Sequence, residues 1–276
     1  MRAAIDIGSN SVRLATTDGM KRSIITKLAD GIEATGRLSP VGVEATIEVL
    51  KEYTTLSSGA SEIVAFATEA VRRATNGVDF CKTVKEQVGL EIKIVPKNIE
   101  ARLALFGATK PKGASTVCDL GGGSMEVICA SDGVTPEYEM SLPLGVVVLK
   151  NKYNGDYAAL SRDAQTLISG YGTLPLYPLT AMGGSATTIA AAIQNLPYYD
   201  ASKVNGYVIT LKELDEFMPI LMSDKLGILR PVAKKRADTV VYGAIMLTAL
   251  CHRIGVDRFH VSDTSNLDAV LNGFEL

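Results

Sequence analysis

The sequence predicts an α/β protein built from two related domains, and an internal repeat carries this prediction. Two stretches, AAIDIGSNSVRL at residues 3–14 and TVCDLGGGSMEVI at residues 116–128, share one layout of apolar run, aspartate, glycine-containing turn and apolar run. Three landmarks recur at a spacing of 113 positions: Asp6 and Asp119, Gly8 and Gly121, and Ser11 and Ser124. Matching landmarks in a single register indicate a duplicated unit. The order of expected elements after each stretch is also the same.

Each stretch is typical of a β-hairpin whose turn can hold an anion. Glycine accepts positive φ and lets a ligand approach the backbone, so that successive N–H groups can form an anion-binding nest. Expected phosphate-binding residues are Gly8, Ser9, Asn10 and Ser11 in the first turn, and Gly121, Gly122, Gly123 and Ser124 in the second. An ordinary glycine-rich hairpin without a ligand is the alternative for either turn alone. Two such hairpins facing each other would form an interdomain cleft for a phosphorylated ligand.

The first half of the chain is expected to form a strand meander followed by crossover units. The predicted strands lie at residues 2–6, 12–17, 23–27, 63–66 and 90–95, and the predicted helices at 40–56, 78–87 and 98–108, with a helical stretch broken at Asn76-Gly77. Ser39 and Pro40 suit the N-cap and N1 positions of the first of these helices. Because a meander is antiparallel and crossover units are parallel, we expect a mixed sheet with helices packed on it.

The second half is expected to repeat this plan after a linker at residues 110–113. Further strands are predicted at residues 137–143, 179–182 and 258–261, and helices at 156–169, 187–193, 211–222 and 236–254, before a closing helix. Residues Gly183, Gly184 and Ser185 form a third glycine-rich turn that opens a helix, where unpaired N–H groups and the helix dipole favour an anion; a turn without a ligand is again the alternative. We expect domains at residues 1–110 and 111–276, with a closing helix able to pack back on the first.

Composition excludes several classes of partner. The chain has 276 residues, 47% of them hydrophobic, and a net charge of −2, which provides no general attraction to nucleic acid or to an anionic membrane. Residues 164–199 carry no charge, but their prolines and glycines favour a buried region over a membrane span. The four cysteines, Cys81, Cys118, Cys129 and Cys251, lack metal-ligand spacing and are expected to be free thiols. Asp6 interrupts any signal peptide, so a cytoplasmic protein is expected.

The chemistry expected of these features is hydrolysis of a phosphorylated ligand by an activated water, because no nucleophile motif accompanies the turns. Asp119, placed directly before its turn, suits a hydrated divalent cation such as Mg²⁺. Glu100, at the start of a predicted helix, is the candidate base, although a carboxylate in a first helical turn also stabilises any helix. Basic residues expected near a ligand are Lys27, Arg72, Arg73, Lys97 and residues 234–236, with Arg72 the strongest candidate.

Several motifs together resemble the exopolyphosphatase/guanosine pentaphosphate phosphohydrolase (Ppx/GppA) family of the actin-like ATPase superfamily. In family order they are AAIDIGSNSVRLA, KLADGI, FATEAVRRATNG, IEARLALFGA, VCDLGGGSMEVI, SLPLGVVVL, AMGGSATTIAA and HVSD. The resemblance implies two RNase H-like domains around an interdomain cleft. It also implies Glu100 as the catalytic glutamate, Asp119 and Glu126 as acidic cation-binding residues, with Asp6 as a further candidate, and Arg72 and Lys27 as phosphate contacts.

The resemblance implies a Mg²⁺-dependent hydrolase that acts on inorganic polyphosphate or guanosine pentaphosphate, with a homodimer as a possible assembly. The chain departs from the family pattern at Lys97, Ile99, Met125 and Asn266, positions that bear on turnover and substrate choice. Two alternatives stay open. An actin-like kinase or ATPase would need an adenosine pocket, and a non-catalytic binder of polyphosphate or of the guanosine alarmone would bind without releasing phosphate.

Overall fold

The computed structural model describes residues 1–109, 113–223, 229, 232–233 and 237–276, apart from the side chains of Glu33, Lys97 and Thr109. These residues form two compact units, which we treat separately. Unit 1 contains residues 1–103 and 265–276, and unit 2 contains residues 104–264. The chain therefore passes between the units twice, within one helix and between Thr264 and Ser265.

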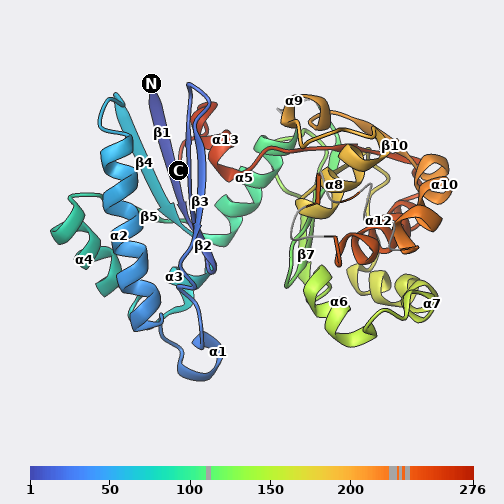
Figure 1. Ribbon diagram of the computed structural model, residues 1–276, viewed down its shortest axis with the longest axis horizontal. Helices are drawn as coiled ribbons and strands as arrows, with labels where there is room; N and C mark the ends of the chain where they lie inside the picture. The colour runs from blue at the N-terminus through green and yellow to red at the C-terminus, as the bar shows by residue number, and fades with distance from the viewer. Residues whose placement is uncertain (110–112, 224–228, 230–231, 234–236) are drawn as a thin grey trace. The chain divides into compact units, whose positions relative to one another are not determined.

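Unit 1 is a mixed sheet with helices packed on it (Figure 1). Its elements are β1 (Arg2–Ile7), β2 (Ser11–Thr16), β3 (Lys21–Ile25), α1 (Ile32–Thr35), α2 (Pro40–Leu56), β4 (Glu62–Ala67), α3 (Glu69–Arg73), α4 (Gly77–Val88), β5 (Ile92–Ile94), the first part of α5 (Lys97–Thr109) and α13 (Asn266–Leu271). Within the described residues the strand order is β3-β2-β1-β4-β5, antiparallel through the meander and parallel from β1 to β5. The predicted meander with crossover units is confirmed.

Helix α2 begins where the sequence predicts. Ser39 is its N-cap and accepts a hydrogen bond from the Gly42 N–H at 3.3 Å, and Pro40 occupies the first helical position. Its apolar face buries Ile47, Leu50 and other residues against the sheet core.

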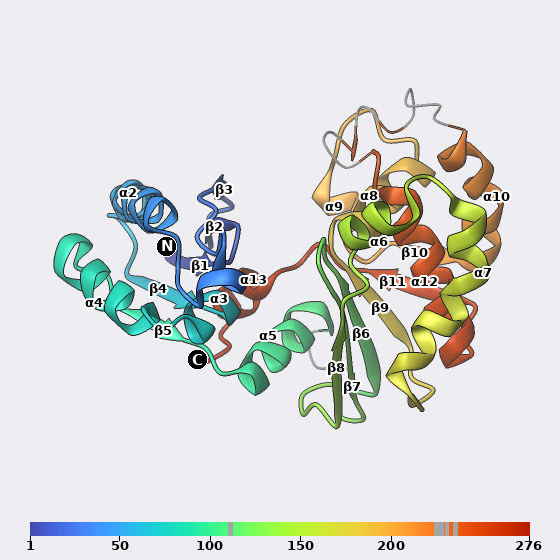
Figure 2. The same ribbon diagram turned by 90° about the horizontal axis from the view of Figure 1, so that it is seen from below.

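Unit 2 repeats the plan with a larger sheet and more helices (Figure 2). Its elements are β6 (Ser115–Leu120), β7 (Met125–Ala130), β8 (Tyr138–Leu142), α6 (Val146–Tyr153), α7 (Tyr157–Ile168), the 3₁₀ helix η1 (Ser169–Tyr171), β9 (Leu179–Met182), α8 (Gly184–Ile193), α9 (Ala201–Val204), β10 (Val208–Thr210), α10 (Leu211–Met222), α12 (Val240–Ile254) and β11 (Arg258–Val261). The strand order is β10-β11-β9-β6-β7-β8 within the described residues.

Helix α12 lies at the centre of the unit 2 core. It contacts α6, α7, α8 and α10, and most of its residues are buried. The end of α5 packs on the unit 2 sheet through Leu105, which clusters with Val117 of β6 and Met182 of β9.

No helix in the described ranges is both long enough and apolar enough to cross a bilayer. Cys118, Cys129 and Cys251 are buried free thiols, as predicted, and Cys81 is a partly buried one.

The internal repeat is confirmed in the strand register. Strand β1 pairs antiparallel with β2 so that Ile7 faces Val12, and β6 pairs with β7 so that Leu120 faces Met125, at positions related by the same spacing. On its other edge, β1 pairs in parallel with β4, and β6 likewise pairs in parallel with β9. The pairing of β1 with β2 and β4 in unit 1 is therefore the same as the pairing of β6 with β7 and β9 in unit 2.

The structure adds elements that the sequence did not predict, above all α6 and β10. Helix α6 contains the Val146–Val148 run, and a run of β-branched residues favours a strand by intrinsic propensity. Helix α8 begins at Gly184 instead of Thr187, so that the predicted third turn is already helical. The predicted linker falls mainly on residues 110–112, and the predicted start of the 236–254 helix on residue 236, both outside the described residues.

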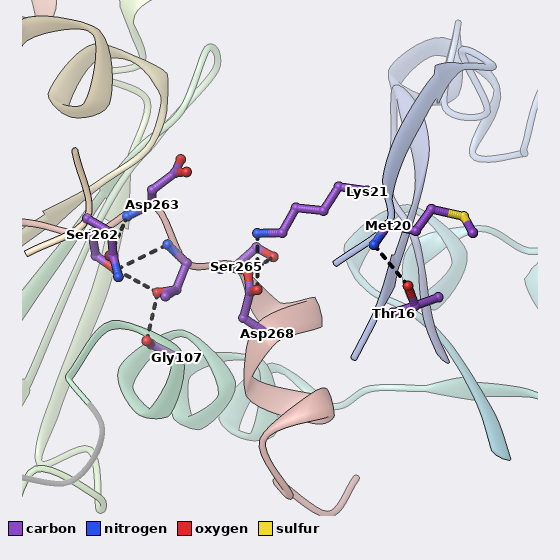
Figure 3. Close-up of polar contacts among 10 residues, drawn as sticks. Thr16, Met20, Lys21, Gly107, Ser262, Asp263, Ser265 and Asp268 are labelled. Carbon is purple, nitrogen blue, oxygen red and sulfur yellow. Dashed lines mark hydrogen bonds and ion pairs between the residues drawn. The ribbon is translucent and has the colours of Figure 1, made fainter. Parts of the chain in front are cut away.

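The closing helix α13 belongs to unit 1, where it contacts β1 and β2. The Asp268 carboxylate accepts hydrogen bonds from the N–H and the hydroxyl of Ser265, both at 2.8 Å, and forms an ion pair with Lys21 Nζ at 3.2 Å (Figure 3). In unit 2, just before this helix, the Thr264 hydroxyl donates to the Gly107 carbonyl at 2.7 Å. Polar contacts therefore hold the chain on both sides of the point between Thr264 and Ser265 where it passes from unit 2 to unit 1.

We predict that Asp268→Ala lowers the free energy of unfolding by about 1–3 kcal/mol, because it removes two charge-assisted hydrogen bonds at the start of α13. Lys21→Ala, which removes only the exposed ion pair, should cost at most about 1 kcal/mol. Chemical denaturation compares the two variants, and amide hydrogen exchange in β1 and β2 should rise for Asp268→Ala. Equal losses in both variants would show that the helix cap contributes nothing.

Candidate functional site

The two predicted phosphate-binding turns have the same backbone geometry. The Gly8 N–H donates to the Ser11 carbonyl at 3.0 Å, and the Gly121 N–H donates to the Ser124 carbonyl at 3.0 Å. In both turns the two central residues are exposed and the two outer ones are half-buried. The hairpin that the sequence predicts is therefore present twice, with its tip open to solvent.

The carbonyl groups of the second turn are held by the start of α6, which lies beside the end of the β6–β7 hairpin (Figures 1 and 2). N–H groups of residues 145–148 donate to the carbonyls of residues 121–123, at 2.9 Å for Val147 to Gly122 and 3.0 Å for Val146 to Gly121. A Cβ at Gly145 would lie 2.3 Å from the Gly122 carbonyl group, so only glycine permits this approach. The helix thereby fixes the orientation of the turn's peptide groups.

The first turn is held in the same way by the segment that follows β3. The Asn10 carbonyl accepts from the N–H groups of Thr26 at 3.0 Å and Lys27 at 3.1 Å, and the Ser9 carbonyl accepts from Ala29 at 2.9 Å. Lys27 has a φ of 53°, which is unusual for a residue with a side chain. Strained backbone of this kind persists where the surrounding contacts impose it, often at functional sites.

While the carbonyl groups of each turn are held in this way, N–H groups of the same turns stay available to a ligand. The N–H groups of Ser9, Asn10, Gly122 and Gly123 donate to no acceptor within the part of the chain that the structure describes. Successive exposed N–H groups are suited to phosphate oxygens. Lys27, whose side chain is exposed, adds a positive charge near the first turn.

Two carboxylates lie side by side beneath the second turn. Asp119 on β6 faces Glu126 on β7 in the ladder, and directly opposite residues have Cβ atoms about 4.5–5.5 Å apart. The Ser141 hydroxyl donates to Glu126 Oε1 at 2.6 Å and orients that carboxylate. No group of three or more His, Cys, Asp or Glu side chains in the described part of the chain is arranged to hold a metal ion. A pair still fits Mg²⁺, which proteins often bind with one or two carboxylates plus substrate phosphates.

The corresponding pair in unit 1 has opposite charges. Asp6 faces Arg13 across β1 and β2, and the two side chains form an ion pair in which Asp6 is buried. Because the Asp6 carboxylate is engaged by a guanidinium, we do not assign it to the cation. Sequence reasoning missed Arg13, although the repeat places it at the position equivalent to Glu126.

The third predicted anion site, at the start of α8, is only partly suited to a ligand. Gly183 has a φ of 92° and packs so closely that a Cβ there would lie 2.5 Å from the Leu120 carbonyl oxygen and 3.3 Å from Asp119 Oδ1. Gly184 is half-buried, but the Ser185 side chain is buried against Gly243 of α12. Ser185 could therefore contact a ligand only through its backbone N–H.

Glu100 lies in the first turn of α5 and contacts Arg72 of α3. Arg72 Nη1 donates to Glu100 Oε2 at 3.1 Å and to the Val95 carbonyl at 2.6 Å, so one nitrogen joins three segments of unit 1. Burial raises the pKa of the Glu100 carboxyl above its ordinary value, the hydrogen bond and charge of Arg72 oppose this rise, and the nearby negative charge of Asp6 adds to it. A carboxylate with a raised pKa that is still held in position suits a general base.

Arg73, the neighbour of Arg72, is another basic residue that the sequence singled out. Arg73 is exposed and forms an ion pair with Glu69 at 3.2 Å. The Lys97 side chain and residues 234–236 lie outside the described residues. Arg102 is exposed and lies over the Phe274 ring, 5.6 Å from its centroid, a structural contact within unit 1. Sequence reasoning also missed Gly145, which packs against the second turn, although SLPLGVVVL contains it.

Comparison with known proteins places these features in a family. A crystal structure of the Ppx/GppA phosphatase of Aquifex aeolicus matches with a TM-score of 0.85 and 30% identity, over 100% of this chain and 99% of that one. Exopolyphosphatase 2 of Mycobacterium tuberculosis is 28% identical over 97% of this chain and 96% of its own length. The α/β class with two RNase H-like domains is confirmed.

A bifunctional 3-dehydroquinate synthase/phosphatase of Fusobacterium nucleatum is 26% identical over 100% of this chain, and the chain spans 47% of that protein. The model of the Ppx/GppA phosphatase family matches residues 11–272, nearly the whole chain. The chain belongs to the Ppx/GppA phosphatase family.

Proposed function

We propose that the chain is a phosphatase that releases terminal phosphate from inorganic polyphosphate, with a water molecule activated by Glu100. The observation that carries the proposal is the Glu100–Arg72 contact, in which a partly buried carboxylate with a raised pKa is held at the start of α5. Family membership and the exopolyphosphatases among the relatives support a polyphosphate substrate.

In the proposed reaction Glu100 accepts a proton from the attacking water. The water oxygen forms a bond to the terminal phosphorus while the bond from that phosphorus to the bridging oxygen breaks. Orthophosphate is released, and the bridging oxygen leaves on the shortened chain. Arg72 holds the Glu100 carboxylate in position through Nη1, and the rest of its guanidinium is the predicted phosphate contact.

The turn N–H groups of both units, together with the start of α8, are proposed to bind the phosphates. Polyphosphate carries a negative charge on each phosphate. Successive backbone N–H groups can donate hydrogen bonds to the oxygens of these phosphates. That both turns bind one substrate stays a prediction.

Asp119 and Glu126 are the residues proposed to hold a divalent cation such as Mg²⁺. When bound, the cation would neutralise phosphate charge as negative charge develops on the leaving oxygen. Guanosine pentaphosphate as a substrate, the homodimer and the cytoplasmic location also stay predictions.

Phosphate release from polyphosphate and from guanosine pentaphosphate, each with and without Mg²⁺, tests the proposal. Release from polyphosphate that requires the cation is expected. Tight binding without release would indicate the non-catalytic alternative, and turnover of ATP alone would indicate the kinase or ATPase alternative.

We predict that Glu100→Gln lowers the rate of phosphate release by about 10²–10⁴-fold, because the amide cannot accept the proton. Substrate affinity should change little, since the shape of the side chain is kept. Glu86→Gln, an exposed carboxylate on α4, is the matched control and should retain full activity. Unchanged turnover in Glu100→Gln would remove Glu100 from the mechanism.

The pH dependence of kcat/KM reports the base in the free enzyme. Activity should fall as the pH falls through the raised pKa of Glu100, at a higher pH than an ordinary glutamate would give. Because Arg72 opposes the rise, Arg72→Gln should move this acidic limb to still higher pH, whereas Arg72→Lys should move it less. Arg73→Gln serves as the control. An acidic limb that stays in place in Arg72→Gln would refute the role of the Glu100–Arg72 contact.

Asp119→Asn should raise the Mg²⁺ concentration needed for half-maximal activity, since a neutral amide is a weaker ligand for a hard cation. Asp215→Asn, an exposed aspartate on α10, makes the same chemical change elsewhere in unit 2. Mg²⁺ titrations of the activity of both variants test this prediction, and only Asp119→Asn should need more Mg²⁺ than wild type. A titration of Asp119→Asn that matches wild type would make Asp119 a structural turn residue.

A further inference from the structure

The two hairpins agree in sequence spacing, strand register and turn geometry, but differ in charge beneath the turn. Asp6 and Asp119 occupy equivalent places, and each faces the equivalent residue on the next strand. That residue is Arg13 in unit 1 and Glu126 in unit 2. One hairpin therefore carries a pair of opposite charges, and the other a pair of like charges.

This difference changes what each hairpin needs in order to be stable. Asp6 is only 1% exposed, and a buried carboxylate is costly unless a partner compensates its charge. The Arg13 guanidinium is that partner in the folded chain. Like charges directly opposite each other in a sheet destabilise it, so the Asp119–Glu126 pair gains from a bound cation in a way that the Asp6–Arg13 pair does not.

The difference also changes what each turn offers to a phosphate. An uncompensated carboxylate beneath the first turn would repel an anion bound by the N–H groups of Ser9 and Asn10. Arginine always carries its charge in proteins, so Arg13 cancels this repulsion without a metal ion.

We propose that Arg13 is the built-in counter-ion of the first hairpin, so that the first turn binds phosphate without a metal and the divalent cation is confined to the second hairpin. The confinement rests on the proposed function, which places the cation at Asp119 and Glu126. Arg13 is a positioning residue in this account, since it acts through Asp6.

Counting bound Mn²⁺ per chain by electron paramagnetic resonance, with inorganic phosphate present, tests the proposal without measuring activity. Wild type should bind one Mn²⁺. Arg13→Glu gives the first hairpin the charges of the second and should bind a second Mn²⁺. Arg22→Glu makes the same change of charge on the neighbouring strand β3, where Leu14 is the facing residue, and should bind no more than wild type.

Two further variants separate the inference from the proposed function. Adding Asp6→Asn to Arg13→Glu should abolish the gained site, because one of its two carboxylates is lost. Asp119→Asn alone should weaken the wild-type site, so that it no longer fills at the Mn²⁺ concentration that saturates wild type. An unchanged Mn²⁺ affinity in Asp119→Asn would overturn the placement of the cation but not the gain in Arg13→Glu. A count for Arg13→Glu equal to that for Arg22→Glu would overturn the inference.

Thermal unfolding gives a second readout. Arg13→Glu should unfold several degrees below wild type, because it faces the buried Asp6 with a like charge, and added Mn²⁺ should recover most of the loss. NaCl at equal ionic strength should not recover this loss in unfolding temperature. Where Arg13→Glu fails to fold, Arg13→Asp also gives the first hairpin two facing carboxylates with a shorter side chain, and it should gain a second Mn²⁺ site. Absence of any gained site in Arg13→Asp would then overturn the inference.

Discussion

Hydrogen bonds from outside each hairpin hold the backbone carbonyl groups of its turn. The arrangement of each proposed phosphate site depends on these hydrogen bonds. In unit 2 the first N–H groups of α6 donate to residues 121–123, and in unit 1 the segment after β3 donates to Ser9 and Asn10. These contacts keep the peptide planes of the exposed turn residues in place. The close approach of α6 to the second turn requires glycine at position 145, and Lys27 adopts a positive φ in the segment that donates to the first turn.

The duplicated frame carries different chemistry in its two copies. Unit 1 adds Glu100 and Arg72, which meet because α3 and α5 follow the parallel strands β4 and β5. Unit 2 adds Glu126 opposite Asp119, and a helix start that packs against Asp119. A symmetric scaffold therefore supports an asymmetric assignment of roles, with the proposed base in one unit and the proposed cation ligands in the other.

Much of this could be predicted from residue order, because the decisive signals are local. The repeat of Asp, Gly and Ser, the cap at Ser39-Pro40 and the amphipathic run after it correspond to β1, β6 and α2 as the structure has them. Helix α6 could not be predicted in this way, since its valine run favours a strand and tertiary contacts override that preference. The ion pair of Asp6 with Arg13, the burial of Ser185 and the Glu100–Arg72 contact depend on strand pairing and helix packing that no single segment encodes.

Amide hydrogen exchange at the turns tests most directly whether their N–H groups bind phosphate. The measurement uses the Glu100→Gln variant, to prevent turnover, with and without saturating tripolyphosphate. The N–H groups of residues 9–10 and 122–123 should exchange more slowly when tripolyphosphate is bound, while exposed residues of α4 and α10 should not change. Saturable binding of tripolyphosphate with unchanged exchange at both turns would contradict the account.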